Sequence, residues 1–234
     1  MKPTLFLATI GLACLAVGEW IELIGAGDLD RWRHVSDGLV VAGDAELDGD
    51  NARHLKALPG TGVLVGEKRT GNLHTRESFG DCELHLEFML AKRSNSGVKL
   101  HGHYEIQLLD SYGRKKLKGS DCGGVYPHWK WTGGRFTYLD DGVPPACNAA
   151  KPAGEWQTLD IIFQAPRFDE PGKKTANARF IRVELNGRVI HDDVELKSPT
   201  GFVTLKAKEV AKGPLMLQCD HGAVAFRNVR IRER

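Results

Sequence analysis

Residues 94–111 (SNSGVKLHGHYEIQLLDS) place acid, base and amide side chains at alternate positions. Lys99, His101, Glu105 and Gln107 are separated by apolar residues on both sides of a predicted tight turn. Successive side chains of a strand point to opposite faces of a sheet, so these four groups are expected on one face. A carboxylate beside cationic and amide groups can accept a proton and stabilise an anion. A solvated outer face explains the same alternation.

The element that positions these groups is predicted to be a β-hairpin that turns at residues 102–103. Its opposite face is apolar and is expected to pack on a core: it carries Val98, Leu100, Tyr104, Ile106 and Leu108. We interpret Glu105 as a general base. Lys99, His101 and Gln107 are interpreted as groups that hold hydroxyls or stabilise a negative charge that develops in a reaction. A salt-bridged strand residue is the alternative for Glu105.

A second group of polar residues lies near the C-terminus, at 218–222 (QCDHG). Gln218 and Asp220 alternate with apolar residues, so Gln218 is predicted to face the same surface as Glu105. Imidazole is suited to proton transfer near neutral pH, and His221 is our candidate for the acid or proton shuttle. The alternative is a turn, since Asp and Gly are favoured there for backbone reasons.

Residues 112–154 form a long stretch with no convincing strand pattern. Segments of this length inside a domain are uncommon and usually functional or disordered. Its aromatic residues argue against disorder. Tyr126 and Trp129 are predicted to contact a sugar, and a small satellite core is the alternative. Asp110, just before the stretch, either caps it or binds a sugar hydroxyl.

Composition predicts one large all-β domain. The chain has 234 residues, 41% of them hydrophobic, with 27 glycines and 10 prolines. Many short apolar runs separated by turn residues indicate two antiparallel sheets packed face to face. Its 32 basic and 30 acidic residues show no basic run of the kind that binds nucleic acid.

The N-terminus resembles an export signal covering residues 1–18, followed by a single domain at 19–234. Lys2 precedes an apolar run at 5–17 that is too short to span a bilayer. Export to the periplasm or the extracellular space is expected, with no membrane span in the mature chain. A lipoprotein signal ending at Cys14 and a buried N-terminal strand are alternatives.

Four cysteines follow the predicted signal: Cys82, Cys122, Cys147 and Cys219. An even number in an exported protein permits two disulfides, with three possible pairings. A Cys122–Cys147 bond within the long aromatic stretch is the favoured pairing. None of the spacings matches a zinc site.

Seven motifs occur in an order that resembles a known family. They are FGDCELHLEF (79–88), NSGVKL (95–100), YEIQLLD (104–110), PAGEW (152–156), LNG (185–187), GPLMLQCDHG (213–222) and FRNVRI (226–231). They resemble the domain-of-unknown-function 1080 family, also called the 3-keto-disaccharide hydrolase or 3-keto-glucoside lyase/hydratase domain. The resemblance implies a concanavalin A-like jelly-roll sandwich with a long aromatic-rich loop, export, and action on glycosides oxidised at C3. Lys99 and His101 depart from the family's common residues, which puts the substrate preference in question.

A ketone at C3 acidifies the C2 proton of a sugar. Its removal by Glu105 allows elimination of the glycosidic oxygen from C1, and hydration of the resulting glucal completes a net hydrolysis. This chemistry needs a separate sugar 3-oxidoreductase to make the keto sugar. No metal site is predicted. A divalent cation near His85, Glu87 and Glu105 is the alternative, because it would stabilise the enolate. The alternative function is a non-catalytic sugar-binding sandwich that stacks Trp129 and Trp131 on its ligand.

Overall fold

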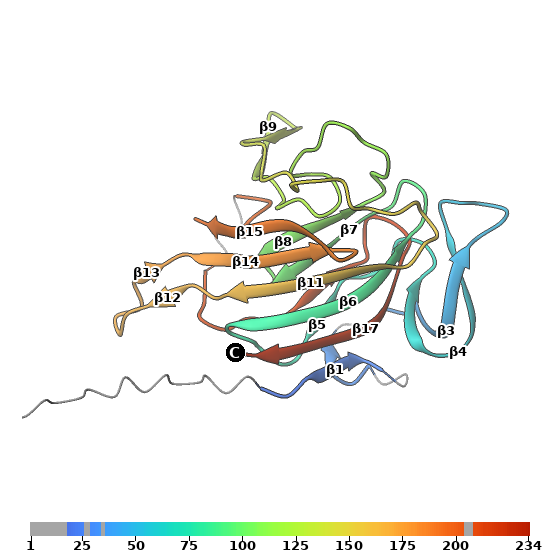
Figure 1. The fold of residues 1–234 in the computed structure, drawn as a ribbon, viewed down its shortest axis with the longest axis horizontal. Coiled ribbons are helices and arrows are strands. Elements are labelled where there is room, and N and C mark those ends of the chain that lie inside the picture. Colours follow the sequence, from blue (N-terminus) through green and yellow to red (C-terminus); the bar gives the residue numbers. More distant parts are fainter. Residues whose placement is uncertain (1–17, 26–28, 34–35, 204–207) are drawn as a thin grey trace, which may run out of the picture.

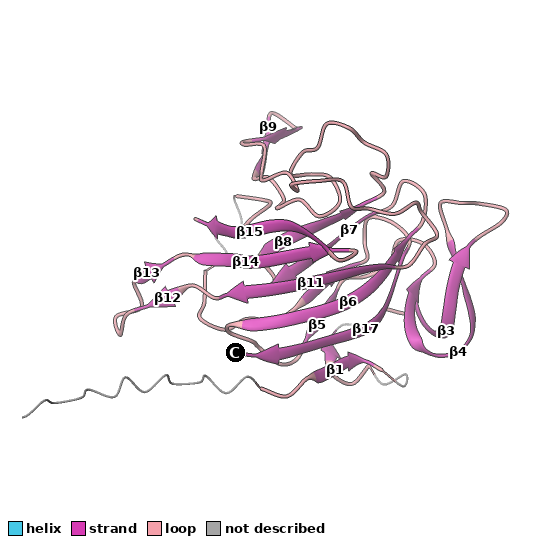
Figure 2. Ribbon diagram, viewed as in Figure 1, coloured by secondary structure: helices cyan, strands magenta, loops and turns pink. Residues whose placement is uncertain are grey.

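The computed structural model describes residues 18–25, 29–33, 36–203 and 208–234. Within these ranges every regular element is a β-strand, and the large sheets carry most of them (Figures 1 and 2). None of the described residues belongs to a helix long and apolar enough to cross a membrane. The predicted signal at 1–18 lies outside the described residues except for Gly18, whose N–H donates to Glu233 O at 2.9 Å.

The larger sheet has eight antiparallel strands, and its centre is the pair formed by β6 and β17. In sheet order the strands are β15 (Arg188–Leu196), β14 (Ala178–Leu185), β11 (Gln157–Gln164), β6 (Cys82–Leu90), β17 (Val224–Glu233), β4 (Leu55–Gly66) and β3 (Leu39–Leu47), with β1 (Ile21–Ile24) also paired to β17. Side chains of β6 alternate between the two faces of the sheet. Leu84, Leu86 and Phe88 are buried, while Glu83 and His85 are partly exposed on the other face.

The smaller sheet has five strands and lies behind the larger one in the view of Figure 1. Its order is β2 (Trp32–Arg33), β5 (Leu73–Thr75), β16 (Met216–Gln218), β7 (Asn95–Leu100) and β8 (Tyr104–Leu109). One core cluster joins apolar side chains from both sheets, among them Val98 and Ile106 on one side and Leu86 and Phe163 on the other. This face-to-face packing confirms the all-β jelly-roll sandwich.

The hairpin predicted at 94–111 is β7 and β8, and its apolar face is buried as expected. Its turn, however, contains three residues instead of two. His101 joins Gly102 and His103 between Leu100 and Tyr104, and both His101 (φ 55°) and Gly102 (φ 68°) are left-handed. The extra turn residue takes His101 off the alternation of the strands.

The long aromatic stretch is not strand-free, contrary to the prediction. It holds a hairpin of β9 (Trp129–Thr132) and β10 (Arg135–Tyr138), which pairs with neither large sheet (Figure 1). Gly133 and Gly134 both have positive φ, as a two-residue type I′ turn requires. Asn186 and Gly187, between β14 and β15, both have positive φ as well. A further small hairpin is formed by β12 (Arg167–Phe168) and β13 (Lys174–Ala176).

The predicted Cys122–Cys147 disulfide is absent, because all four cysteines described are free. Cys82 and Cys219 are buried in the core. Cys122 is also buried, and burial raises the pKa of its thiol to about 12. Cys147 is only partly buried. The loop containing Cys122 is held instead by a hydrogen bond from its N–H to Ser111 Oγ at 3.0 Å.

Candidate functional site

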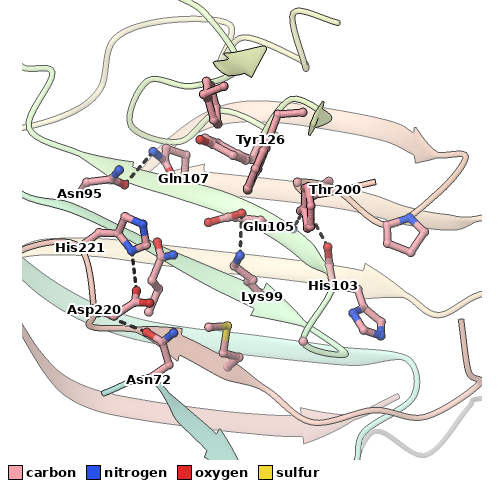
Figure 3. A pocket seen from close by; sticks show the side chains of 18 of the residues that line it. Asn72, Asn95, Lys99, His103, Glu105, Gln107, Tyr126, Thr200, Asp220 and His221 are labelled. Atoms are coloured by element: carbon pink, nitrogen blue, oxygen red, sulfur yellow. Dashed lines mark hydrogen bonds and ion pairs between the residues drawn. The ribbon is translucent and has the colours of Figure 1, made fainter. Parts of the chain in front are cut away.

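The outer face of the smaller sheet forms the floor of a cavity of about 490 Å³ (Figure 3). Side chains of β7, β8 and β16 point into it from below. The β9–β10 hairpin contributes an aromatic wall, and residues 199–202 and 220–221 complete the rim. The cavity therefore lies on the side of the sheet opposite the hydrophobic core.

Glu105 lies at the floor of this cavity with only 2% of its surface exposed. Lys99 stands directly opposite on β7, and its Nζ is 3.0 Å from Glu105 Oε2. Burial raises the pKa of the Glu105 carboxyl, and the Lys99 ammonium acts in the opposite direction. Glu105 is therefore a carboxylate that accepts a proton more readily than usual, and the Lys99 cation lies next to it.

Gly97 makes room for the Glu105 side chain. It lies two residues before Lys99 on the same face of β7, and a Cβ there would collide with Glu105 Oε1. The glycine is required for close approach, since its φ is not left-handed. On the other side, the Glu105 N–H donates to Thr200 Oγ1 at 3.1 Å, which ties β8 to the cavity rim.

Amides line the cavity beside the acid. Gln107 is buried and its Nε2 donates to Asn95 Oδ1 at 3.0 Å across the hairpin. Gln218 extends from the neighbouring strand β16 and also lines the cavity. These amides offer donors and acceptors suited to sugar hydroxyls.

His221 lies on the rim, with its Nδ1 2.6 Å from Asp220 Oδ1 (Figure 3). The Asp220 carboxylate favours a proton on Nδ1 and leaves Nε2 for exchange. Asn72 fixes this segment, because its Oδ1 accepts hydrogen bonds from the N–H groups of Cys219 at 2.8 Å and Asp220 at 3.2 Å. The His221 side chain is 49% exposed, so it can exchange protons with water.

The aromatic wall is built around Trp129. Its ring stacks on Phe202, with centroids 4.5 Å apart and planes 27° from parallel, and it also contacts Phe136. His128 anchors the wall from outside the hairpin: its Nδ1 is 2.5 Å from Asp140 Oδ2 and its Nε2 is 3.0 Å from Ser198 Oγ. Aromatic faces of this kind stack on the apolar C–H faces of sugar rings.

A family model described as the 3-keto-alpha-glucoside-1,2-lyase-like domain matches residues 19–232. The chain belongs to this family. Membership places it among carbohydrate-active enzymes and confirms the resemblance drawn from the seven motifs.

Solved structures agree with this assignment. A candidate glycosyl hydrolase from Parabacteroides distasonis is 27% identical, with a TM-score of 0.64 over 92% of this chain and 84% of that chain. A second candidate glycosyl hydrolase from the same organism is 19% identical, with a TM-score of 0.59 over 92% of this chain and 100% of that chain, and supports the fold alone. A search of curated proteins found no match.

The structure brings together most of the residues predicted for the site of this lyase-like domain. The cavity is lined by Lys99, Glu105, Gln107, Tyr126, Trp129, Gln218 and His221. Their location on one surface follows from strand parity on β7, β8 and β16 and from the fold of the aromatic stretch over the sheet. Their catalytic and binding roles stay predictions.

His101 does not reach the cavity. It is 2% exposed, and its ring packs edge-on against Phe163, with centroids 5.1 Å apart, at the end of the core. Burial lowers the pKa of this imidazole, which disfavours its charged form. The three-residue turn explains the difference from the prediction, since the left-handed backbone at His101 rotates its side chain away from the polar face.

Asp110 also lies away from the cavity. Its Oδ2 accepts a hydrogen bond from the Arg93 N–H at 2.8 Å. Arg93 has a φ of 59°, so the carboxylate stabilises a turn that a non-glycine residue rarely adopts. This contact stabilises the turn between β6 and β7, so it shows neither of the two roles predicted for Asp110.

The three residues considered for a divalent cation do not converge. His85 and Glu87 lie on the outer face of β6, where they contact Asp160 and Arg227, respectively. Glu105 lies on the outer face of the other sheet. Within the described part of the chain, no group of three or more His, Cys, Asp or Glu side chains is arranged to hold a metal.

Several residues of the cavity were missed in the sequence. Asn95 and Gly97 share the parity of Lys99 and were therefore recognisable as part of the same face. The Gly133–Gly134 pair was a recognisable hairpin signal for the wall. Thr200 and Phe202 come from a loop after β15, and no local pattern indicated that this loop reaches the site.

Proposed function

We propose that this chain cleaves 3-keto-glycosides by elimination followed by hydration. The observation that supports this most is the buried Glu105–Lys99 pair on the cavity floor. Abstraction of a proton next to a ketone needs a base and a positive charge at the developing enolate. The pair offers both within one cross-strand contact.

In the proposed elimination, a Glu105 oxygen takes the C2 proton, and the electrons of the C2–H bond form the enolate. Lys99 stabilises the negative charge on the C3 oxygen. The enolate then re-forms the ketone with a C1–C2 double bond, while the C1–O bond breaks and its electrons go to the leaving oxygen. His221 donates a proton to that oxygen from Nε2, while the contact of its Nδ1 with Asp220 orients the ring.

Hydration reverses the proton transfers. Water adds to C1 of the keto-glucal, His221 takes a proton from it, and protonated Glu105 returns a proton to C2. The products are a 3-keto sugar and the free leaving group. Gln107, Gln218 and Tyr126 hold hydroxyls, and Trp129 stacks on the ring. His101 and Asp110 have no part in this scheme.

The proposal includes a place in the cell and a preceding reaction. Export to the periplasm or beyond, directed by residues 1–18, brings the domain to glycosides before uptake. Because the substrate carries a ketone at C3, a separate sugar 3-oxidoreductase has to oxidise the glycoside first.

The test is incubation of the purified chain with aryl 3-keto-glucosides in D₂O, monitored by proton NMR. Release of the aryl alcohol, a transient glucal signal and deuterium at C2 are expected. The same rate after treatment with a chelator is expected, because Lys99 supplies the positive charge. Aryl alcohol release without C2 exchange, or cleavage of the unoxidised glucoside at the same rate, contradicts the proposal.

A non-catalytic sugar-binding domain is the second candidate, favoured by the exposure of Trp131, which is 56% exposed beside the cavity. It predicts binding of both keto and unoxidised glucosides with no turnover. Calorimetry on the same ligands separates the two functions.

A further inference from the structure

A second groove of about 370 Å³ adjoins the cavity. His221 lines both spaces, so it stands between them. The groove runs along the turn between β6 and β7 and the segments that flank β4. Five cationic residues line it: Arg53, Lys68, Arg69, Lys92 and Arg93.

The charge of this groove is unbalanced. No Asp or Glu lines it, and none of its five cationic side chains forms an ion pair with a carboxylate in the described ranges. Two carboxylates lie at its edges: Asp110 accepts a hydrogen bond from the Arg93 N–H, and Asp220 is hydrogen-bonded to His221. Some cations elsewhere on the surface do form ion pairs, for example Arg167 with Asp81.

The groove has fixed walls. The Lys92 N–H donates to Ala52 O at 2.8 Å, which joins two of its segments. Ser94 Oγ donates to Ala223 O at 2.6 Å and joins a third. Gly222 packs so closely that a Cβ there would collide with Ser94. The five cationic side chains therefore extend from backbone segments that are packed against one another.

We propose that this groove is a leaving-group subsite for glycosides whose leaving group carries an anionic substituent, such as a carboxylate or a phosphate. The inference rests on the proposed function, because it uses His221 as the residue that protonates the leaving oxygen. A sugar in the cavity with its leaving oxygen at His221 directs the leaving group into the groove. Arginine and lysine side chains bind carboxylate and phosphate by charge-assisted hydrogen bonds.

Binding of the anionic substituent in the groove neither forms nor breaks a covalent bond. The C1–O bond breaks, its electrons go to the leaving oxygen, and that oxygen takes the His221 proton. The anionic substituent stays charged throughout and remains paired with the groove cations. The cations therefore act on substrate recognition, and the cavity alone carries the elimination.

The test compares three aryl 3-keto-glucosides that differ only at a distant position of the leaving group: 4-(carboxymethyl)phenyl, 4-(phosphonomethyl)phenyl and the neutral 4-(carbamoylmethyl)phenyl. The wild type is expected to show a kcat/KM at least about tenfold higher for an acidic substrate than for the amide at low salt. The preference is expected to fall in 0.5 M NaCl, because surface charges are screened.

The variant Lys68→Gln/Arg69→Gln is expected to lower the ratio of acid to amide kcat/KM by at least about threefold. The matched control Lys173→Gln/Arg188→Gln removes two exposed cations elsewhere and is expected to leave the ratio unchanged. A preference for either acid supports the subsite, and the two acids tell carboxylate from phosphate. Equal ratios in the wild type and the Lys68→Gln/Arg69→Gln variant overturn it.

Calorimetry with the corresponding unoxidised glucosides separates this inference from the proposed function. These ligands lack the ketone, so binding is measured without turnover. If no keto-glucoside reacts but acidic ligands bind more tightly than the amide, and the Lys68→Gln/Arg69→Gln variant loses this difference, the anion subsite stands and the proposed reaction fails. Turnover without any preference for the acids supports the proposed reaction and overturns the subsite.

Discussion

The outer faces of the two sheets carry the same alternation of polar and apolar residues, but they differ in how exposed their polar side chains are. On the outer face of β6, Glu83 pairs with Arg232 and Glu87 pairs with Arg227, and these side chains stay partly exposed. On the outer face of β7 and β8, Glu105 and Gln107 are buried. The difference comes from what covers each face, since the aromatic hairpin and residues 199–202 lie over the smaller sheet.

The pKa values of the two glutamates at the centre of these faces are shifted in opposite directions. Partial burial works to raise the pKa of Glu87, but hydrogen bonds from Asn228 and Arg227 outweigh it and hold that pKa below its usual range. Burial raises the pKa of Glu105 despite Lys99. The comparison shows that an acid paired with a cation becomes a candidate base only when the pair is also removed from water.

The largest expected effect is at Glu105. Glu105→Gln keeps the shape and removes the base, so turnover of a 3-keto-glucoside is expected to fall by about 10²–10⁴-fold. Glu87→Gln makes the same change on the open face and is expected to keep its turnover within twofold of the wild type. Aryl alcohol release measures both, with circular dichroism to confirm folding. Equal losses in the two variants would remove the distinction between the faces.

Replacement of Lys99 tests the cation of the buried pair. Lys99→Met is expected to lower kcat by about 10²–10³-fold through loss of enolate stabilisation. The pH profile carries a second signature. Glu105 acts as a base only when deprotonated, so kcat/KM rises as pH passes its pKa, which burial has raised. Without Lys99 that pKa rises further, and the acidic limb of the profile moves to higher pH. Arg227→Met, on the open face, is expected to change neither kcat nor the position of the acidic limb of the pH profile.

Gly97 tests whether the position of Glu105 matters as well as its charge. Gly97→Ala adds a methyl group that collides with Glu105 Oε1, and displacement of the base is expected to lower kcat by about 10–100-fold. Gly49→Ala is the matched control, because no atom lies within 4 Å of the added Cβ. Thermal unfolding of both variants separates misplacement from instability. An unchanged kcat in Gly97→Ala contradicts the crowding described here.

The smallest effect is expected at the aromatic wall. Trp129→Ala is expected to raise KM about tenfold, equivalent to about 1.4 kcal/mol of lost stacking, with little change in Tm. Trp156 on the larger sheet gives the reverse pattern: its ring packs under Arg227, so Trp156→Ala is expected to lower Tm and leave KM unchanged. Steady-state kinetics and a melting curve on both variants are sufficient. A rise in KM for Trp156→Ala alone would reverse the comparison.

The sequence predicted the sandwich and most of the site because strand alternation is a local signal. Parity alone assigned Glu105, Gln107 and Gln218 to the correct face. It failed at His101, where one additional turn residue changed the direction of the side chain. Hairpin turns of two and three residues differ in backbone conformation, and the residue types at 101–103 did not separate them.

Strand parity also cannot predict which face of a sheet is covered by other segments of the chain. That depends on contacts distant in sequence, such as the hydrogen bond of His128 to Ser198 and the stacking of Trp129 on Phe202. The missed disulfide has a related cause. Cysteine count permits a bond, but only the path of the chain determines whether Cys122 and Cys147 meet, and burial of Cys122 next to Ser111 stabilises the loop without one.

The aromatic hairpin β9–β10 has a consequence for how this protein can diverge. Its strands pair only with each other, and an isolated bridge from Trp129 to Phe202 joins it to the rim. A change in its length or residues therefore leaves the register of both large sheets intact. The proposed base Glu105 lies on strand β8 of the smaller sheet, whereas the aromatic wall that we propose contacts the ligand lies on a separate hairpin. We therefore expect that replacing this hairpin changes the contacts to a ligand at little risk to folding.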